Sequence, residues 1–475
     1  MNILVYAPNS LFSPERELIH QIIMKKLEEG HNVTVLYCKG GACSINPLGL
    51  RKICNVCVKC STAMSENVEK ITGPENLNFQ YYENSIKSTQ INSDTELKKQ
   101  TYKKEDIGYA VLSTYIGITR DYKPNLHNST VLKYLNRLAS TFISTYEEIL
   151  YLVKKYRFEE VNLFNGRLNN TRAALRAARS QNVNVYVHEV VGLENKTQVF
   201  LNELPHNIEA NQFKISKLYE KYKMQAREIA REFYSRKRRG EAVNDKSYTS
   251  KQDINALPNG FDKNVKNIVF FTSSEDEFKA IGKEWEEGIY DDQIYAIRRL
   301  SELASKIDAH LYVRVHPNVK FAHKSYRKSI MSISHPSLTL IGPDSEISSY
   351  RLLDDSDIVI TNGSTIGIEG AFWRKPSILL STSFYKGLGS TYEPKTEAQL
   401  LELLESNHLQ PLDDIGAIKM AVFYVKNGEF IDGFEGNKSE GYSCFGSKIK
   451  LTKKDVASYR TGKVFEKIYN TLFLK

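Results

Sequence analysis

A turn of small, hydroxyl-bearing residues follows a short apolar run in the second half of the chain. Residues 358–360 are β-branched, which is typical of a buried parallel strand. The turn at residues 361–365 follows directly and contains Gly363, Ser364 and Thr365. Apolar spacing then predicts a helix over residues 366–372. A helix that begins at such a turn presents unpaired N–H groups and the positive end of its dipole. The pattern predicts an anion site, with an ordinary capped strand–helix loop as the alternative.

A second apolar run ends in side chains suited to the same ligand. Residues 311–315 are apolar apart from Arg314, and His316 and Pro317 complete the segment. Ligands of an open parallel sheet bind beyond the carboxyl ends of its strands. We therefore expect Arg314 and His316 to share one crevice with the turn at residues 363–365.

Three other residues are assigned to this predicted pocket. Ser273 and Ser274 follow an expected strand at residues 266–272 and would line its other side. Glu369 would accept hydrogen bonds from the ribose of a nucleotide, or would pair locally.

Two expected strands in the first half also end in polar groups. Residues 159–164 lead to Asn165 and Arg167, and residues 183–187 lead to Glu189. A carboxylate that leaves a buried strand at the mouth of a crevice suits a general base. The alternative for Glu189 is to cap a helix or to pair with Arg167.

Five of the six cysteines lie between residues 38 and 60. In a reducing compartment this is not a disulfide framework. Four of these thiols could hold a tetrahedral zinc ion or an iron–sulfur cluster, with free thiols in a compact loop as the alternative. A bound metal would brace an irregular insertion. The proposed ligands are Cys43, Cys54, Cys57 and Cys60.

Length and composition set broad limits. A chain of 475 residues with 41% hydrophobic and 25% charged residues is typical of a globular protein with two domains. No run is apolar enough to span a bilayer and the N-terminus has no signal-peptide pattern, so we expect a cytoplasmic protein. The net charge of +9 favours phosphorylated ligands or an anionic membrane surface. Nucleic acid is not expected, because no zinc-finger or aromatic–basic platform motif occurs.

Alternating strand and helix patterns predict two parallel α/β units joined by a charged helical passage. Two such Rossmann-like domains facing each other across a cleft are the architecture of a GT-B glycosyltransferase. The expected divisions are 1–205, an acceptor-side domain with the cysteine-rich insertion; 206–260, a helical linker; 261–410, a nucleotide-sugar-binding domain; and 411–475, a helical or irregular tail packing back on the first domain.

Several segments resemble bacterial capsule and surface-polysaccharide glycosyltransferases, a group that includes the Kdo transferases and the bacterial polysialyltransferases. Residues 313–317 and 362–371 resemble the His-Pro and Ser/Thr motifs of that group. Residues 165–167 and 188–192 are similar to its acceptor-side segments, and residues 270–277 to its first C-terminal βα turn. The resemblance covers most of residues 1–400 and is specific for the superfamily, not for the sugar.

This resemblance implies roles for individual residues. His316 would contact the donor phosphate, with Ser364 and Thr365 hydrogen-bonding the same group. Glu189 falls where the family has its catalytic base, although this chain has an extra residue before Gly192. No Asp-x-Asp stands in a metal-binding setting, in agreement with metal-independent transfer in such enzymes.

The predicted activity is inverting, metal-independent transfer of a sugar from a nucleotide-activated donor to a growing bacterial capsule or O-antigen glycan. The acceptor would be a glycan or lipid-linked glycan, reached at the anionic inner face of the plasma membrane, and no cofactor would be required for catalysis. One alternative is a polyol-phosphate transferase of the teichoic-acid type. Another is a non-catalytic protein that binds glycan during assembly.

Overall fold

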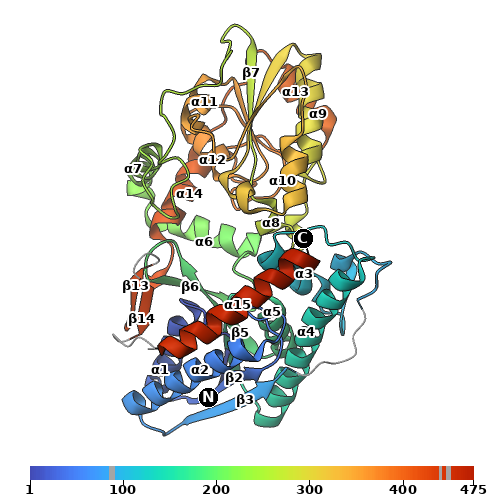
Figure 1. Cartoon of the computed structure of the whole chain (residues 1–475). Coiled ribbons are helices and arrows are strands. Elements are labelled where there is room, and N and C mark those ends of the chain that lie inside the picture. Colours follow the sequence, from blue (N-terminus) through green and yellow to red (C-terminus); the bar gives the residue numbers. More distant parts are fainter. Residues whose placement is uncertain (85–90, 438–440, 445–450, 475) are drawn as a thin grey trace. The chain divides into compact units, whose positions relative to one another are not determined.

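A computed structural model describes residues 1–84, 91–437, 441–444 and 451–474 (Figure 1). The chain forms two compact units. Unit 1 contains Met1–Asn207 and Gly428–Lys475, and unit 2 contains Ile208–Asn427.

Unit 1 is built on a seven-stranded sheet with the order β12-β6-β5-β4-β1-β2-β3. The five strands from β5 to β3 are parallel, and β6 and β12 add an antiparallel edge. Because β1 lies between β2 and β4, the order of the strands reverses at β1. The strands are β1 (Asn2–Ala7), β2 (Asn32–Gly40), β3 (Leu77–Glu83), β4 (Glu160–Phe164), β5 (Asn184–Val191), β6 (Lys196–Leu201) and β12 (Glu429–Phe430).

Helices complete unit 1, with a β13–β14 hairpin (Phe434–Asn437 and Gly441–Cys444) near its end. Apolar residues of β1 and β2 pack against α1 in a buried core. The long helix α4 begins where Asn128 accepts hydrogen bonds from the N–H groups of Thr130 and Val131, a strong N-terminal cap. The helices are α1 (Glu15–Glu28), α2 (Arg51–Thr72), η1 (Leu97–Lys99), α3 (Ile107–Thr119), α4 (Ser129–Tyr156), α5 (Asn169–Arg179) and α15 (Lys453–Phe473).

Unit 2 is built on a five-stranded parallel sheet with the order β11-β10-β7-β8-β9. The chain runs from β7 through β8 to β9, then crosses to the other side of β7 for β10 and β11. Its strands are nearly continuous apolar runs because helices cover both faces of the sheet. They are β7 (Lys266–Phe271), β8 (Ala309–Arg314), β9 (Leu338–Ile341), β10 (Ile358–Thr361) and β11 (Ser377–Leu379).

The helices of unit 2 lie before, between and after these strands. They are α6 (Ile208–Lys221), η2 (Lys223–Gln225), α7 (Ala226–Arg238), α8 (Glu275–Phe278), η3 (Lys283–Trp285), α9 (Gln293–Lys306), η4 (Pro317–Phe321), α10 (Lys324–Met331), α11 (Ser349–Asp355), α12 (Thr365–Phe372), α13 (Glu397–Glu405) and α14 (Ile415–Lys426). Among the described residues, no helix combines the length and the apolar character needed to cross a bilayer.

The expected fold class, two Rossmann-like α/β units with parallel sheets, is confirmed. The division of the chain differs from the expected one. Nearly all of the expected 206–260 linker belongs to unit 2, which begins at Ile208. Its helix α7 packs on α14, and the Tyr234 hydroxyl donates to the Ala417 carbonyl at 2.8 Å. The expected 411–475 tail is split, since α14 is part of unit 2 and α15 packs on α2 in unit 1.

Candidate active site

Three loops of unit 2 meet where the strand order reverses. The register pairs Phe271 of β7 with Arg314 of β8 on one side and with Thr361 of β10 on the other, so the three strands end at one level. The backbone N–H of His316 donates to the Thr272 hydroxyl at 2.9 Å. The Ser273 hydroxyl donates to the Asn362 carbonyl at 3.0 Å. These bonds hold the three loops together at the ligand-binding edge of the sheet.

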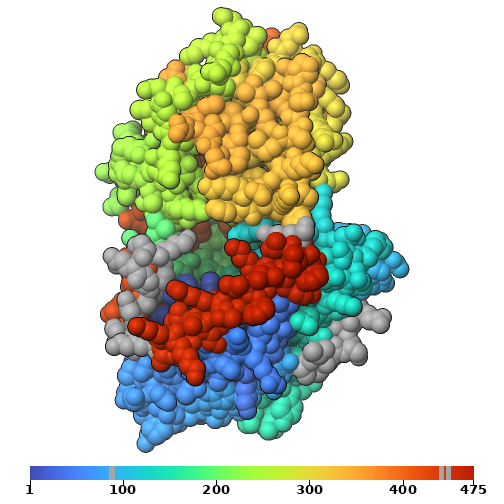
Figure 2. Space-filling view, in the orientation of Figure 1, coloured from blue at the N-terminus to red at the C-terminus, as the bar shows by residue number. Residues whose placement is uncertain are grey.

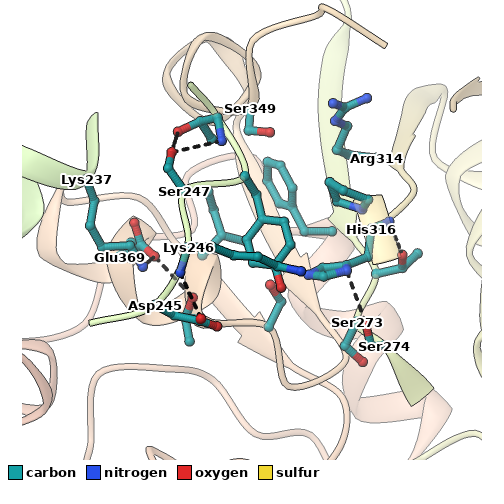
Figure 3. Close-up of a pocket in the computed structure, with 18 of the residues that line it drawn as sticks. Lys237, Asp245, Lys246, Ser247, Ser273, Ser274, Arg314, His316, Ser349 and Glu369 are labelled. Atoms are coloured by element: carbon teal, nitrogen blue, oxygen red, sulfur yellow. Dashed lines mark hydrogen bonds and ion pairs between the residues drawn. The ribbon is translucent and has the colours of Figure 1, made fainter. Parts of the chain in front are cut away.

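A cavity of about 320 Å³ opens at this edge (Figure 3). It is bordered by the loops after β7, β8 and β10, by the first turn of α12, and by a segment at residues 243–249 that we call the 243–249 segment. Its volume falls at the lower end of the range for small-molecule sites. The two loops expected from the sequence to share a pocket, one with His316 and one with Ser364 and Thr365, do so.

His316 is held as a neutral hydrogen-bond donor. Its Nδ1 atom accepts from the backbone N–H of Asn318 at 3.1 Å and lies 3.1 Å from the Ser274 hydroxyl. Burial, together with the nearby charges of Lys246 and Arg314, lowers the pKa of the imidazole to about 4. With Nδ1 occupied as an acceptor, the single proton lies on Nε2. Nε2 makes no hydrogen bond to any described residue.

The turn before α12 needs glycine and leaves its donors at the cavity. Gly363 has a φ of +97°, and a Cβ there would lie 2.8 Å from the Thr382 carbonyl oxygen. Ser364 begins the helix without a side-chain cap, and its carbonyl accepts from the Tyr385 hydroxyl at 2.7 Å. Thr365 and Ile366, whose N–H groups belong to the uncapped first turn, border the cavity.

Two residues predicted for the donor pocket, Arg314 for the phosphate and Glu369 for the ribose or a local pair, have protein partners in the structure. The Arg314 guanidinium donates to the carbonyls of Gly342 at 2.6 Å and Ser345 at 2.8 Å, and Figure 3 shows it directed away from His316. The buried Glu369 pairs with Lys237 at 2.5 Å and accepts from the Tyr350 hydroxyl at 2.7 Å. Arg314 therefore stiffens a loop and Glu369 pairs locally, because buried charged groups require partners.

Ser273 and Ser274 also form hydrogen bonds with other residues of the protein. Ser273 is buried, and its backbone N–H donates to the Gln293 side chain at 2.6 Å. Ser274 lies against Nδ1 of His316. These residues line the cavity as expected, but in the structure they position the loops.

The 243–249 segment supplies residues that the sequence analysis missed. The ring of Tyr248 lies 4.9 Å from the His316 ring, and its hydroxyl accepts from the Asn318 side chain at 3.1 Å. Lys246 lies 4.9 Å from the Tyr248 ring centroid and donates to the Asn318 side-chain oxygen at 3.3 Å. The polar run around them was interpreted as a linker, and no local pattern in it indicates a binding segment.

Unit 1 has a second cavity, of about 600 Å³, at the corresponding edge of its own sheet. Residues after β1 and β4 and residues of β5 line it, including Asn165, Arg167 and Glu189. Asn165 has a φ of +61°, which turns the chain so that its amide donates to Glu189 at 2.5 Å. Its side-chain oxygen accepts from the backbone N–H of Arg167 at 3.1 Å. The three residues predicted for the acceptor side therefore meet at one cavity.

Glu189 has the protonation behaviour of a base that works near neutral pH. Burial raises the pKa of its carboxyl group to about 7, while hydrogen bonds from Asn165 and Val190 and the charge of Arg167 oppose the rise. The residue does not follow its strand as predicted. It lies inside β5, which continues to Val191 because β6 pairs with it and places Gln198 opposite Glu189.

Glu15, at the start of α1, is a second carboxyl group in this cavity and was not predicted. Its Oε2 atom accepts from the Asn9 side chain at 3.2 Å, and its buried Oε1 atom has no partner among the described residues. Burial raises the pKa of this group to about 8, with a smaller contribution from the charge of Glu189. Acidic residues are common at the start of helices, so the position of Glu15 in the sequence did not indicate this role.

The expected metal site is not formed by the residues that the structure describes. Cys54, Cys57 and Cys60 lie on helix α2, where an irregular loop was expected. The Cys54 thiol donates to the Gly41 carbonyl at 3.6 Å, and burial raises the pKa of the Cys43 thiol to about 12. Within the described ranges, no group of three or more histidine, cysteine or acidic side chains is arranged to hold a metal ion. All the cysteines are free thiols.

No protein-family model and no curated protein matches the chain. Among solved structures it is similar to the KpsC beta Kdo 2,4 transferase of Thermosulfurimonas dismutans, with 17% identity and a TM-score of 0.36 over 56% of this chain and 79% of that one. It is also similar to the KpsC beta Kdo 2,7 transferase of the same organism, with 15% identity and a TM-score of 0.33 over 58% of this chain and 80% of that one. A third similar structure is a UDP-GlcNAc 2-epimerase of Neisseria meningitidis bound to UDP-GlcNAc, with 13% identity and a TM-score of 0.29 over 89% of this chain and 97% of that one. These TM-scores are low, and the assignment of the fold rests on the strand order and connections of the two sheets.

Proposed function

We propose that this protein is a GT-B-type glycosyltransferase that moves a sugar from a nucleotide-activated donor to a bacterial surface glycan. The observation that carries the proposal is the cavity of unit 2, where the Nε2–H of His316 and the first turn of α12 border one space at the switch point of a parallel sheet. This combination suits a phosphate group. The resemblance of residues 313–317 and 362–371 to glycosyltransferase motifs supports the same function.

In the proposed reaction, unit 2 binds the donor through its phosphate. The bond between the anomeric carbon and the phosphate oxygen breaks, and negative charge grows on the leaving phosphate. His316 donates a hydrogen bond from Nε2, and the N–H groups of Thr365 and Ile366 donate from the helix. Such preorganised donors bind the transition state more tightly than the ground state. Lys246, on the 243–249 segment, adds a positive charge at the rim.

Unit 1 supplies the base in this proposal. Glu189 takes the proton of an acceptor hydroxyl, and the freed oxygen forms a bond to the anomeric carbon as the phosphate leaves, which inverts that centre. The proton ends on Glu189 and the electron pair of the broken bond on the phosphate, so the step balances without a redox partner. Asn165 fixes the Glu189 carboxylate by its 2.5 Å hydrogen bond.

The test is product analysis with purified protein, a panel of nucleotide sugars and a surface-glycan acceptor. A new glycosidic bond and one released nucleotide per transfer are expected. A phosphodiester product would assign the protein to the polyol-phosphate transferases instead. Glycan binding without turnover, unchanged in Glu189→Gln, would make it an assembly protein.

A further inference from the structure

The last described helix of unit 1, α15, presents large apolar side chains to the outside. Figure 2 shows it lying across the surface of unit 1 with its outer side uncovered. Five large apolar residues of this helix are between 49% and 69% exposed. They are Val464, Phe465, Ile468, Leu472 and Phe473. The first four lie on one side of the helix, because they are spaced i, i+1, i+4 and i+8.

The orientation of α15 is fixed by its inner face, which is polar. Glu466 and Asn470 are buried there, and Lys463 donates to Glu466 at 2.7 Å and to the Ile45 carbonyl at 2.7 Å. Gly462 lies so close to α2 that a Cβ would stand 2.6 Å from a side-chain carbon of Ile53. The helix therefore has its polar groups inside and its apolar groups outside, the reverse of an ordinary surface helix.

The exposed charged side chains of α15 are all cationic. Both acidic side chains of α15, Asp455 and Glu466, are buried and ion-paired with lysines. On the neighbouring helix, the Lys52 amine lies 5.9 Å from the Phe465 ring centroid. The exposed charged residues of α15 are Lys453, Lys454, Arg460 and Lys467. The stripe of apolar residues is therefore bordered by cations.

We propose that this outer face of α15 binds an anionic lipid bilayer, with its apolar side chains among the head groups and its cations against lipid phosphates. An apolar stripe flanked by Lys and Arg is the pattern of helices that lie in a membrane interface. A second copy of the chain would bring the same cations face to face, which opposes self-association. The inference does not depend on the proposed activity, because vesicle binding is measured without substrates.

The experiment is flotation of the full chain with vesicles of phosphatidylcholine alone or mixed with phosphatidylglycerol. Binding is expected to the mixed vesicles and to weaken with added salt. The double variant Ile468→Ser, Leu472→Ser should lose at least about tenfold in partition coefficient, because two apolar side chains no longer enter the interface. Its melting temperature should match the wild type, because both side chains are exposed. Lys467→Glu should also bind less.

Matched controls come from the same unit. Leu201 on β6 is 51% exposed, and Leu201→Ser should bind like the wild type. Lys70, exposed near the end of α2, provides the control for the charge change: Lys70→Glu should bind the mixed vesicles more tightly than Lys467→Glu does. Absence of wild-type binding to the mixed vesicles, or equal binding by the double variant, would overturn the proposal. Light scattering that shows a dimer which the double variant converts to a monomer would also overturn it, in favour of a protein interface.

Discussion

The Nδ1 atom of His316 accepts a hydrogen bond from the backbone N–H of Asn318 at 3.1 Å, and this bond fixes the proton of the neutral ring on Nε2. Burial lowers the pKa of the ring to about 4, so the side chain is neutral at physiological pH. The residue therefore offers a ligand a hydrogen bond and not a charge.

Loss of this donor should slow the reaction. His316→Ala is expected to lower turnover by about 10² or more, the scale seen when one transition-state donor is removed. His310, on the strand β8 that leads to His316, is bonded to the Thr339 hydroxyl at 2.8 Å, and His310→Ala provides the matched control with near-normal turnover. Steady-state rates for the two variants check the prediction. Equal rates would remove His316 from the mechanism.

The rate should depend on pH through Glu189. Burial raises the pKa of this carboxyl group to about 7, and only the deprotonated form can accept a proton. We expect kcat/KM to fall about tenfold for each pH unit below about 7 and to level off above it. Glu189→Gln should be inactive at every pH while still binding the donor nucleotide. A rate that falls as pH rises through 7 would contradict the role of Glu189 as base.

Glu15 should make the stability of the protein depend on pH. Burial raises the pKa of its carboxyl group from 4.5 to about 8 in the folded protein, so the unfolded chain loses this proton first as pH rises. The contribution of Glu15 to the free energy of unfolding therefore falls between these values and is lowest above about pH 8. Glu15→Gln should remove this fall, worth on the order of 2 kcal/mol between about pH 6 and about pH 9.

Urea unfolding at the two pH values measures this effect. Glu28→Gln, at an exposed position of the same helix, should keep the wild-type dependence. If Glu15→Gln also keeps it, Glu15 is not the buried acid described above.

The turn before α12 should tolerate no side chain. Gly363→Ala combines a φ of +97° with a Cβ placed 2.8 Å from the Thr382 carbonyl oxygen, whereas Gly387→Ala meets a φ of +79° with no atom within 4 Å. Strain alone should cost about 1 kcal/mol in the Gly387 variant. The Gly363 variant should lose at least ~1 kcal/mol more of unfolding free energy. Equal losses would show that the turn can move away.

Much of the unit-2 site was predictable, because its residues follow strands with strong apolar patterns. The strand at 358–361, the turn at Gly363 and the position of His316 after β8 all follow from local sequence. The partners of Arg314 and Glu369 could not be predicted from local sequence. Arg314 binds carbonyls of the loop after β9, and Glu369 pairs with Lys237 of α7, and no local pattern indicates either contact.

The sequence was least informative where a segment has no regular structure of its own. The 243–249 segment lines the cavity through contacts that are distant in sequence, such as those of Lys246 and Tyr248 with Asn318. Cys54 and Cys57 illustrate the opposite error, since their spacing indicated a metal site while the intervening residues are helical. Glu15 lies near Glu189 through the sheet order and not through sequence proximity.

The central claim is that the cavity around His316 binds the phosphate of a nucleotide. Calorimetric titration of the wild type, His316→Ala and His310→Ala with CMP, CDP, UDP and GDP tests it most directly. One of these nucleotides should bind the wild type and His310→Ala equally, and His316→Ala at least about tenfold more weakly, as for loss of a hydrogen bond to a charged group. If none of them binds, or if His316→Ala binds as well as the wild type, the claim is contradicted.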